Sequence, residues 1–95
     1  MTEIAEKVPQ AEILSQLAEE ACELGHAALK LRRVLAGDNP TPVTLDEAMA
    51  SIEEEIADVE VCLAELKDIR LERVERIKRE KRNRWITRIR GWRKP

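Results

Sequence analysis

The sequence contains few of the residues on which β-sheet proteins and nucleophilic enzymes depend. Its 95 residues include two tryptophans, no tyrosine, no phenylalanine, three glycines and one histidine. With 43% hydrophobic residues, this composition favours a single all-α domain over residues 1–95, built on aliphatic side chains. We find no P-loop, no glycine-rich dinucleotide motif and no Ser-His-Asp pattern, which argues against nucleophilic catalysis by the protein.

Soft metal ligands are equally scarce. Cys22 and His26 are four residues apart, but the other cysteine, Cys62, is distant and no C-x-x-C spacing occurs. At about 100° per residue, Cys22 points away from Glu20, so we interpret the cysteines as buried thiols rather than zinc ligands. The low cysteine content, the lack of a signal peptide and the lack of a membrane-length apolar run predict a cytoplasmic protein without a membrane partner.

Proline, glycine and capping residues divide the chain into helices. The expected helices cover residues 9–36, 45–67 and 72–90, joined first by a loop at 37–44. Pro9 suits a first helical turn, and Gly37 supplies a left-handed C-terminal cap. Thr44 and Glu47 are spaced as a capping box, which specifies the start of the second helix. Neither glycine nor proline marks the break near Asp68, so one continuous bent helix is the alternative there.

Two acidic clusters are the most informative motifs. Glu19-Glu20-x-x-Glu23 and Glu55-x-x-Asp58 each place carboxylates three residues apart, on one side of an expected helix. We expect the two acidic stripes to face each other. Carboxylates held this close repel unless a hard divalent cation lies between them, and oxygen ligands favour Mg²⁺, with Mn²⁺ as an alternative. Magnesium commonly shares its coordination with substrate phosphates, so a phosphate ligand is implied.

The acidic clusters are expected to flank the apolar stripes of their helices. The stripe of the first helix comprises Leu17, Ala21, Leu24, Ala28, Leu31 and Leu35. The stripe of the second comprises Ile52, Ile56, Val59, Leu63 and Leu66. One acidic cluster alone would be interpreted as a solvated helix face, whereas two clusters beside facing stripes favour a site.

At these motifs the chain resembles the MazG-like nucleoside triphosphate pyrophosphohydrolases, an all-α group related to the dimeric dUTPases and dCTPases. The signature of that family is E-E-x-x-E followed by E-x-x-D, and both halves are present. The resemblance covers most of residues 10–90 and includes the stretches 27–33, 39–42 and 55–60. One departure from the family pattern is the long connection between the two clusters. It affects the expected shape of the base-binding pocket more than the expected metal chemistry.

The resemblance implies roles for individual residues. Carried over, the metal ligands are Glu20, Glu23, Glu55 and Asp58. Glu19 would orient or deprotonate water, and either Glu19 or Glu20 would take its proton. Lys30 matches a family position near the phosphates, with a surface lysine as the alternative.

The C-terminal segment is strongly basic. Residues 1–66 contain 15 acidic and four basic residues, for a charge of −11, whereas residues 67–95 contain four acidic and 13 basic residues, for +9. Lys81 and Arg84 are three residues apart, and the resemblance implies that such a pair on the last helix contacts the triphosphate. Nucleic-acid binding and solvated or subunit-bridging cations are the alternatives. We expect Trp85, Ile89 and Trp92 to form a packing stripe.

These observations predict a Mg²⁺-dependent pyrophosphohydrolase that converts a nucleoside triphosphate, in particular a deoxynucleotide, to the monophosphate and pyrophosphate and so controls nucleotide pools. A chain this short cannot enclose a triphosphate, so we expect a homo-oligomer, dimer or tetramer, that completes a helical bundle. The acidic residues 1–66 of one subunit would then contact the basic C-terminal helix of another. The alternative is a non-catalytic interaction module that binds nucleic acid or an acidic partner through the basic C-terminal helix.

Overall fold

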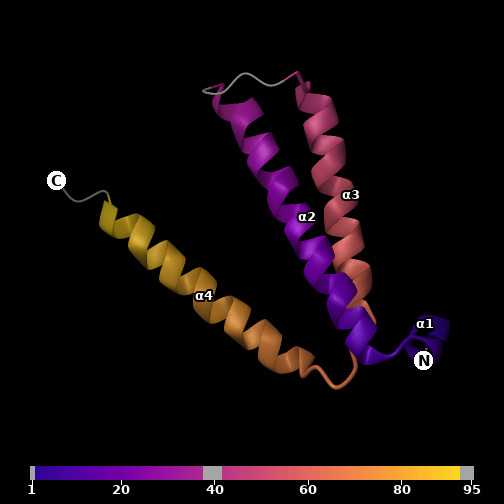
Figure 1. Cartoon of the computed structure of the whole chain (residues 1–95). Helices are drawn as coiled ribbons and strands as arrows, with labels where there is room; N and C mark the ends of the chain where they lie inside the picture. Colours follow the sequence, from indigo (N-terminus) through magenta and orange to yellow (C-terminus); the bar gives the residue numbers. More distant parts are fainter. Residues whose placement is uncertain (1, 38–41, 93–95) are drawn as a thin grey trace.

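The computed structural model describes residues 2–37 and 42–92, and its regular elements are all helices, as predicted. Four helices follow one another along the chain (Figure 1): α1 Glu3–Lys7, α2 Gln10–Ala36, α3 Leu45–Ala64 and α4 Leu71–Trp92. Residues 38–41 of the expected connection lie outside the described residues. No helix in the described ranges combines the length and the apolar character needed to span a bilayer.

The capping residues act as the sequence predicts. Gly37 has a φ of 67°, and its N–H donates a hydrogen bond of 2.9 Å to the Arg33 carbonyl. At the start of α3 the Thr44 hydroxyl accepts from the Glu47 N–H at 3.2 Å, and the Thr44 N–H donates to the Glu47 carboxylate at 3.3 Å. This reciprocal pair is the predicted capping box.

The third and fourth helices are separate. α3 ends at Ala64, three residues before the expected boundary at 67, and Asp68 in the connection has a φ of 63°. Aspartate is among the few residues that tolerate this left-handed conformation, which cannot continue a helix. The alternative of one bent helix is therefore wrong.

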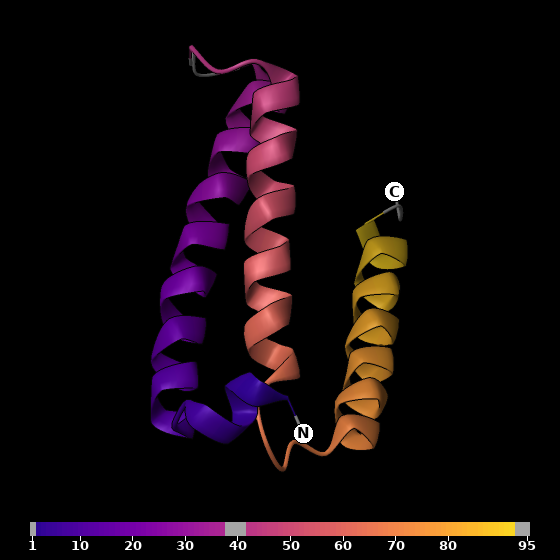
Figure 2. The same cartoon turned by 90° about the vertical axis from the view of Figure 1, so that its right-hand side faces the viewer.

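The short helix α1 was not expected from the sequence. The Thr2 hydroxyl caps it by accepting from the Ala5 N–H at 3.0 Å, and that hydroxyl also donates to the Glu65 carboxylate. Ala5 is buried, so α1 is anchored near the start of α2 (Figure 2). A threonine before an acidic first turn was the signal available for this helix.

α2 and α3 form an antiparallel hairpin (Figures 1 and 2), and their contact follows a seven-residue repeat. Residues at alternating spacings of three and four are buried or half-buried, the pattern of a coiled-coil seam. We call this set the seam. On α2 it comprises Ile13, Leu17, Glu20, Leu24, Ala27, Leu31 and Val34. On α3 it comprises Ala48, Ile52, Glu55, Val59 and Cys62.

The seam corrects the apolar stripes expected from the sequence. Leu17, Leu24, Leu31, Ile52 and Val59 do belong to it, but the other members of both stripes within these helices are exposed. The exposed members are Ala21, Ala28, Leu35, Ile56 and Leu63. The sequence analysis assumed that the glutamates border the apolar stripe of each helix. In the structure one glutamate from each helix lies within the seam. The buried surface of each helix is therefore rotated by about one residue relative to the expected stripe.

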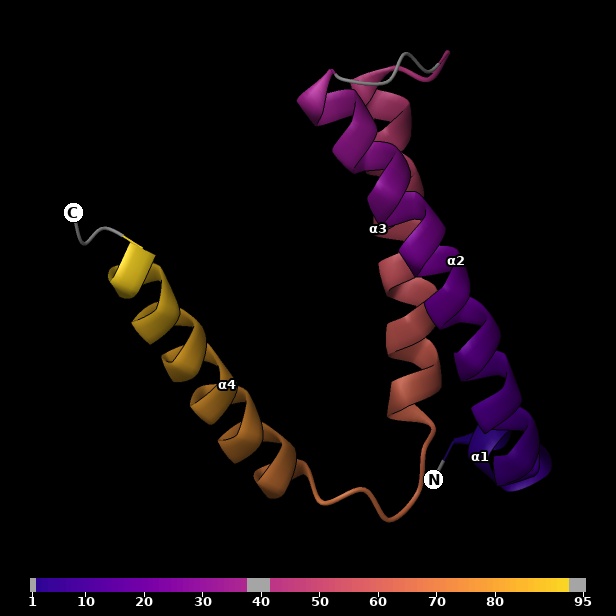
Figure 3. The ribbon, with the colours of Figure 1, turned by 60° about the vertical axis from the view of Figure 1, so that its left-hand side comes forward.

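The helix α4 diverges from the hairpin (Figures 1 and 3). None of its residues is buried, and within the described ranges only α2 and α3 pack extensively against each other. Trp85 and Trp92 are 59% and 74% exposed, so the expected packing stripe has no partner among the residues that the structure describes.

The capping box gives a test of the local fold. Thr44→Ala should lower the free energy of unfolding by about 1 kcal/mol, because it removes an acceptor for the first turn of α3. Urea unfolding followed by circular dichroism measures this change. Ser15→Ala, at an exposed mid-helix position of α2, is the matched control and should not destabilise the chain. Equal losses in both variants would contradict the capping role.

Candidate carboxylate site

Three carboxylates converge in the middle of the hairpin. Glu20 of α2 and Glu55 and Asp58 of α3 each place one oxygen so that all three oxygens lie within 4.8 Å of one another. Glu20 and Glu55 meet because both are seam positions, and Asp58 follows one turn after Glu55. Helix geometry together with the antiparallel pairing therefore brings the two sequence motifs together.

Glu20 is held in place by a neighbour on its own helix. The Gln16 side-chain amide, one turn earlier, donates a hydrogen bond of 2.7 Å to the Glu20 Oε1. A donor at this distance stabilises the ionised carboxylate and limits its rotation. The sequence analysis gave Gln16 no role, although a glutamine four residues before a glutamate on a helix is a recognisable signal.

The surroundings of Glu55 raise the pKa of its carboxyl group. Its Oε2 atom is buried and has no hydrogen-bond partner among the described residues. Burial raises the pKa of Glu55 above its ordinary value of 4.5. The negative charges of Asp58, Glu20 and Glu23 and a hydrogen bond with the Glu20 side chain raise the pKa further. A buried, partnerless carboxylate oxygen surrounded by acidic groups calls for either a proton or a cation.

The donor set fits a hard divalent cation. Three carboxylate oxygens from two rigid helices suit Mg²⁺ or Mn²⁺ better than a soft metal, since neither cysteine belongs to the group. Three ligands leave coordination positions for water and for phosphate oxygens.

The other acidic residues of the motifs lie outside this group. Glu23 is exposed and acts on Glu55 only through its charge. Glu19 is also exposed. The geometry thus brings together three of the four residues that the family resemblance implies as ligands, with Glu23 and Glu19 at the solvent side of α2.

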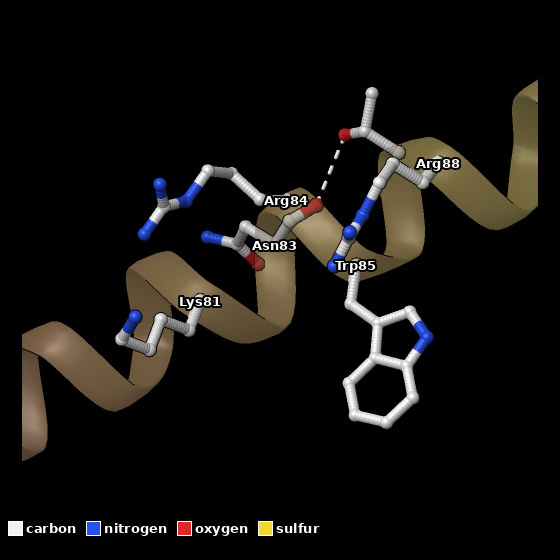
Figure 4. Close-up of a pocket in the computed structure, with 6 residues that line it drawn as sticks. Lys81, Asn83, Arg84, Trp85 and Arg88 are labelled. Atoms are coloured by element: carbon white, nitrogen blue, oxygen red, sulfur yellow. Dashed lines mark hydrogen bonds between the residues drawn. The ribbon is translucent and has the colours of Figure 1, made fainter.

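The cations expected to bind substrate are not beside the carboxylates in one chain. Lys30 is half-buried on α2, about two turns beyond Glu23. Lys81 and Arg84 lie on α4, which does not pack on the hairpin. Figure 4 shows them extending from one side of α4, while the indole of Trp85 projects in a different direction. Asn83, Thr87 and Arg88 complete a shallow pocket there.

Two features were missed from the sequence. An apolar groove of about 520 Å³ lies between α1 and the hairpin and is lined by Ile4, Val8, Ile13 and Val61, among others. It depends on α1, which the sequence analysis did not predict. Cys62 is buried as expected, whereas Cys22 is exposed, so the expectation of two buried thiols is wrong for Cys22.

Comparisons of the chain with protein-family models, with curated proteins and with solved structures found no match.

The raised pKa of Glu55 predicts how stability depends on pH. The folded state holds the Glu55 proton more tightly than the unfolded state, so the free energy of unfolding should fall as pH rises from about 4.5 through the raised pKa. Glu55→Gln should remove this contribution and stabilise the cation-free chain at neutral pH. Urea unfolding between pH 4 and 8 in EDTA checks it.

Glu53→Gln is the matched control, because Glu53 is an exposed carboxylate on the outer side of the same helix. It should keep the pH profile of the unmodified chain. A Glu55→Gln variant that is less stable than the unmodified chain at neutral pH would contradict the proposed repulsion between Glu55 and the neighbouring carboxylates.

Proposed function

We propose that the carboxylate group binds Mg²⁺ or Mn²⁺ and that the chain hydrolyses a nucleoside triphosphate, in particular a deoxynucleotide, to the monophosphate and pyrophosphate. The observation that supports this most is the convergence of Glu20, Glu55 and Asp58 within 4.8 Å, with a buried Glu55 oxygen that has no donor. The resemblance of both acidic motifs to the MazG-like pyrophosphohydrolases supports the choice of reaction and nucleotide-pool control as the role.

The protein residues have distinct parts in this proposal. Glu20, Glu55 and Asp58 hold the cation, and the exposed Glu23 adds negative charge near Glu55. Gln16 keeps Glu20 oriented toward the group. When bound, a divalent ion lowers the pKa of water and neutralises phosphate charge.

Acidic residues of α2 would accept the proton of the attacking water. Glu19 is exposed to water beside Glu20, so it can accept a proton from an attacking water, with Glu20 as the other candidate. Lys30 lies further along α2 and would contact phosphate. Lys81 and Arg84 could reach the triphosphate only from another copy, which makes a homo-oligomer part of the proposal.

Nucleotide hydrolysis tests the proposal directly. The purified chain is incubated with Mg²⁺ and a panel of canonical and modified triphosphates, and pyrophosphate release is measured. Glu55→Gln and Asp58→Asn should each lower turnover by at least about 100-fold, because loss of a ligand removes several kcal/mol of charge stabilisation. EDTA should stop the reaction, and Mg²⁺ or Mn²⁺ should restore it.

Glu53→Gln should retain full activity, since its carboxylate lies on the outer side of α3. Turnover that survives in both site variants would refute the assignment. Rescue by Zn²⁺ alone would point instead to the cysteines and the histidine.

A second candidate function is favoured by the isolation of α4. This helix carries nine basic and three acidic residues, and its cations are exposed. Such a helix can bind nucleic-acid phosphates. Fluorescence anisotropy with a labelled oligonucleotide should then show an affinity that falls steeply between 50 and 200 mM salt, and Lys81→Ala with Arg84→Ala should flatten that slope. A chain that hydrolyses triphosphates and leaves the anisotropy unchanged would dismiss this function.

A further inference from the structure

The distal part of α4 combines dense positive charge with an exposed aromatic ring. Residues 78–84 contain five basic residues, one glutamate and one asparagine, so two turns of the helix carry no apolar side chain. Trp85 follows directly, and its side chain is 59% exposed. No residue of α4 is buried. Both the charge and the ring are therefore accessible to a partner from solution.

Three cations form a row along one side of this segment. Lys81, Arg84 and Arg88 are spaced by three and four residues, which places them within about 60° of one another around the helix and along about 10 Å of its length. We call them the cation stripe. All three side chains are exposed, and none forms a hydrogen bond or an ion pair with another residue that the structure describes. Like charges at this spacing repel each other, and a ligand with several negative charges removes that repulsion.

Trp85 lies at the edge of the cation stripe. It follows Lys81 by four residues and precedes Arg88 by three, so its side chain leaves the helix about 40° to 60° from theirs. Figure 4 shows the indole projecting away from the helix ribbon, and Trp85 lines the same shallow pocket as the three cations. A flat apolar ring beside a row of cations matches the chemistry of a polynucleotide, in which flat bases are joined to charged phosphates.

This combination favours an unpaired strand over a duplex. Inside a duplex both faces of a base are covered by its neighbours, so an exposed indole has no base on which to stack. A base of a single strand can leave its neighbours and stack on an aromatic side chain. Cations alone would bind the phosphates of either form. Trp85 is therefore the residue that distinguishes the two forms.

An anionic lipid surface fits α4 less well. A helix that lies in a bilayer surface needs a continuous apolar face with its cations on the opposite side. The apolar residues of α4 fall into two groups, Leu71, Val74 and Ile77 before the basic segment and Trp85, Ile86, Ile89 and Trp92 after it. Because residues 78–84 interrupt the apolar face for two turns, a polyanion fits this segment better than a lipid surface does.

We propose that residues 78–92 of α4 bind single-stranded nucleic acid. The cation stripe contacts neighbouring phosphates of the strand, and the indole of Trp85 stacks on one of its bases. This inference rests on the second candidate function, nucleic-acid binding by α4, and adds the form of the ligand and the residue that selects it. Single-stranded RNA and single-stranded DNA share this chemistry, since both present phosphates and unpaired bases.

The charge of the rest of the chain limits where the strand lies. Residues 1–66 contain 15 acidic and four basic residues, so they repel phosphates. α4 leads away from the hairpin (Figures 1 and 3). The strand therefore follows the distal part of α4, where the cation stripe and Trp85 lie.

Fluorescence anisotropy in EDTA tests the form of the ligand. Labelled oligo(dT) and oligo(U) of about 20 nucleotides are titrated with the full chain, next to a labelled duplex of the same length. At about 200 mM salt, where phosphate binding is weakened, both single strands should bind at least about fivefold more tightly than the duplex, because only they can stack on Trp85.

Variants separate stacking from charge. Trp85→Ala should weaken single-strand binding by at least about fivefold at every salt concentration and leave the salt slope unchanged, whereas Trp85→Phe should retain most of the affinity. Arg88→Ala should instead reduce the slope of log affinity against log salt by about 0.7. Ile86→Ala, which shortens an exposed apolar side chain on the same turn, and Lys7→Ala, on α1, are the matched controls and should change neither quantity. All these side chains are exposed, so helical circular dichroism should be kept.

A chain that binds no single strand would overturn the proposal. Equal binding of the duplex at about 200 mM salt would also overturn it, as would unchanged affinity in Trp85→Ala. A blue shift of tryptophan emission on phosphatidylglycerol vesicles, without binding of any oligonucleotide, would assign α4 to a lipid surface instead. Displacement of the strand by an equal concentration of a nucleoside triphosphate would assign the pocket to a mononucleotide. The measurement needs neither metal nor turnover, so its outcome is independent of the proposed hydrolysis.

Discussion

The main physical constraint on this structure is the opposition of Glu20 and Glu55 across an otherwise apolar seam. Every other seam position of the two helices carries an aliphatic or thiol side chain that gains from burial. The two glutamates lose hydration there and repel each other, and the closeness of Asp58 increases that cost. A hairpin with so few fully buried side chains has little stability with which to offset this repulsion. A divalent cation between the carboxylates, as in the proposed function, would replace this repulsion with attraction.

Much of the fold could be predicted from local rules. Thr44, Glu47 and Gly37 specify helix ends through hydrogen bonds to their own backbone neighbourhood, so their roles depend on nothing distant. The pairing of the two acidic motifs was also predictable, because helical spacing fixes which carboxylates share a face. The break between α3 and α4 at Asp68 was harder to predict, since an aspartate in the left-handed conformation has no sequence signal comparable to that of glycine.

The rotation of the seam could not be predicted from hydrophobicity alone. α2 has two overlapping seven-residue repeats, one through Glu20 and one through Ala21, and the second is the more apolar. Hydropathy therefore favours the surface that is exposed in the single chain. The choice between the repeats depends on how α2 packs against α3, and that is information about tertiary contact. The lack of packing of α4 on the hairpin was likewise unpredictable. Its amphipathic pattern indicates a packing surface but does not show which element packs against that surface.

The connection at 65–70 joins two bodies of opposite charge, which makes the nearly neutral chain a strong electric dipole. The molecule is 53 Å long, whereas charges in physiological salt are screened over about 8 Å. The length of the molecule thus spans several screening lengths. The acidic hairpin and the distal part of the basic helix therefore each present their own local charge to the solvent, and the net charge of −2 describes neither of them.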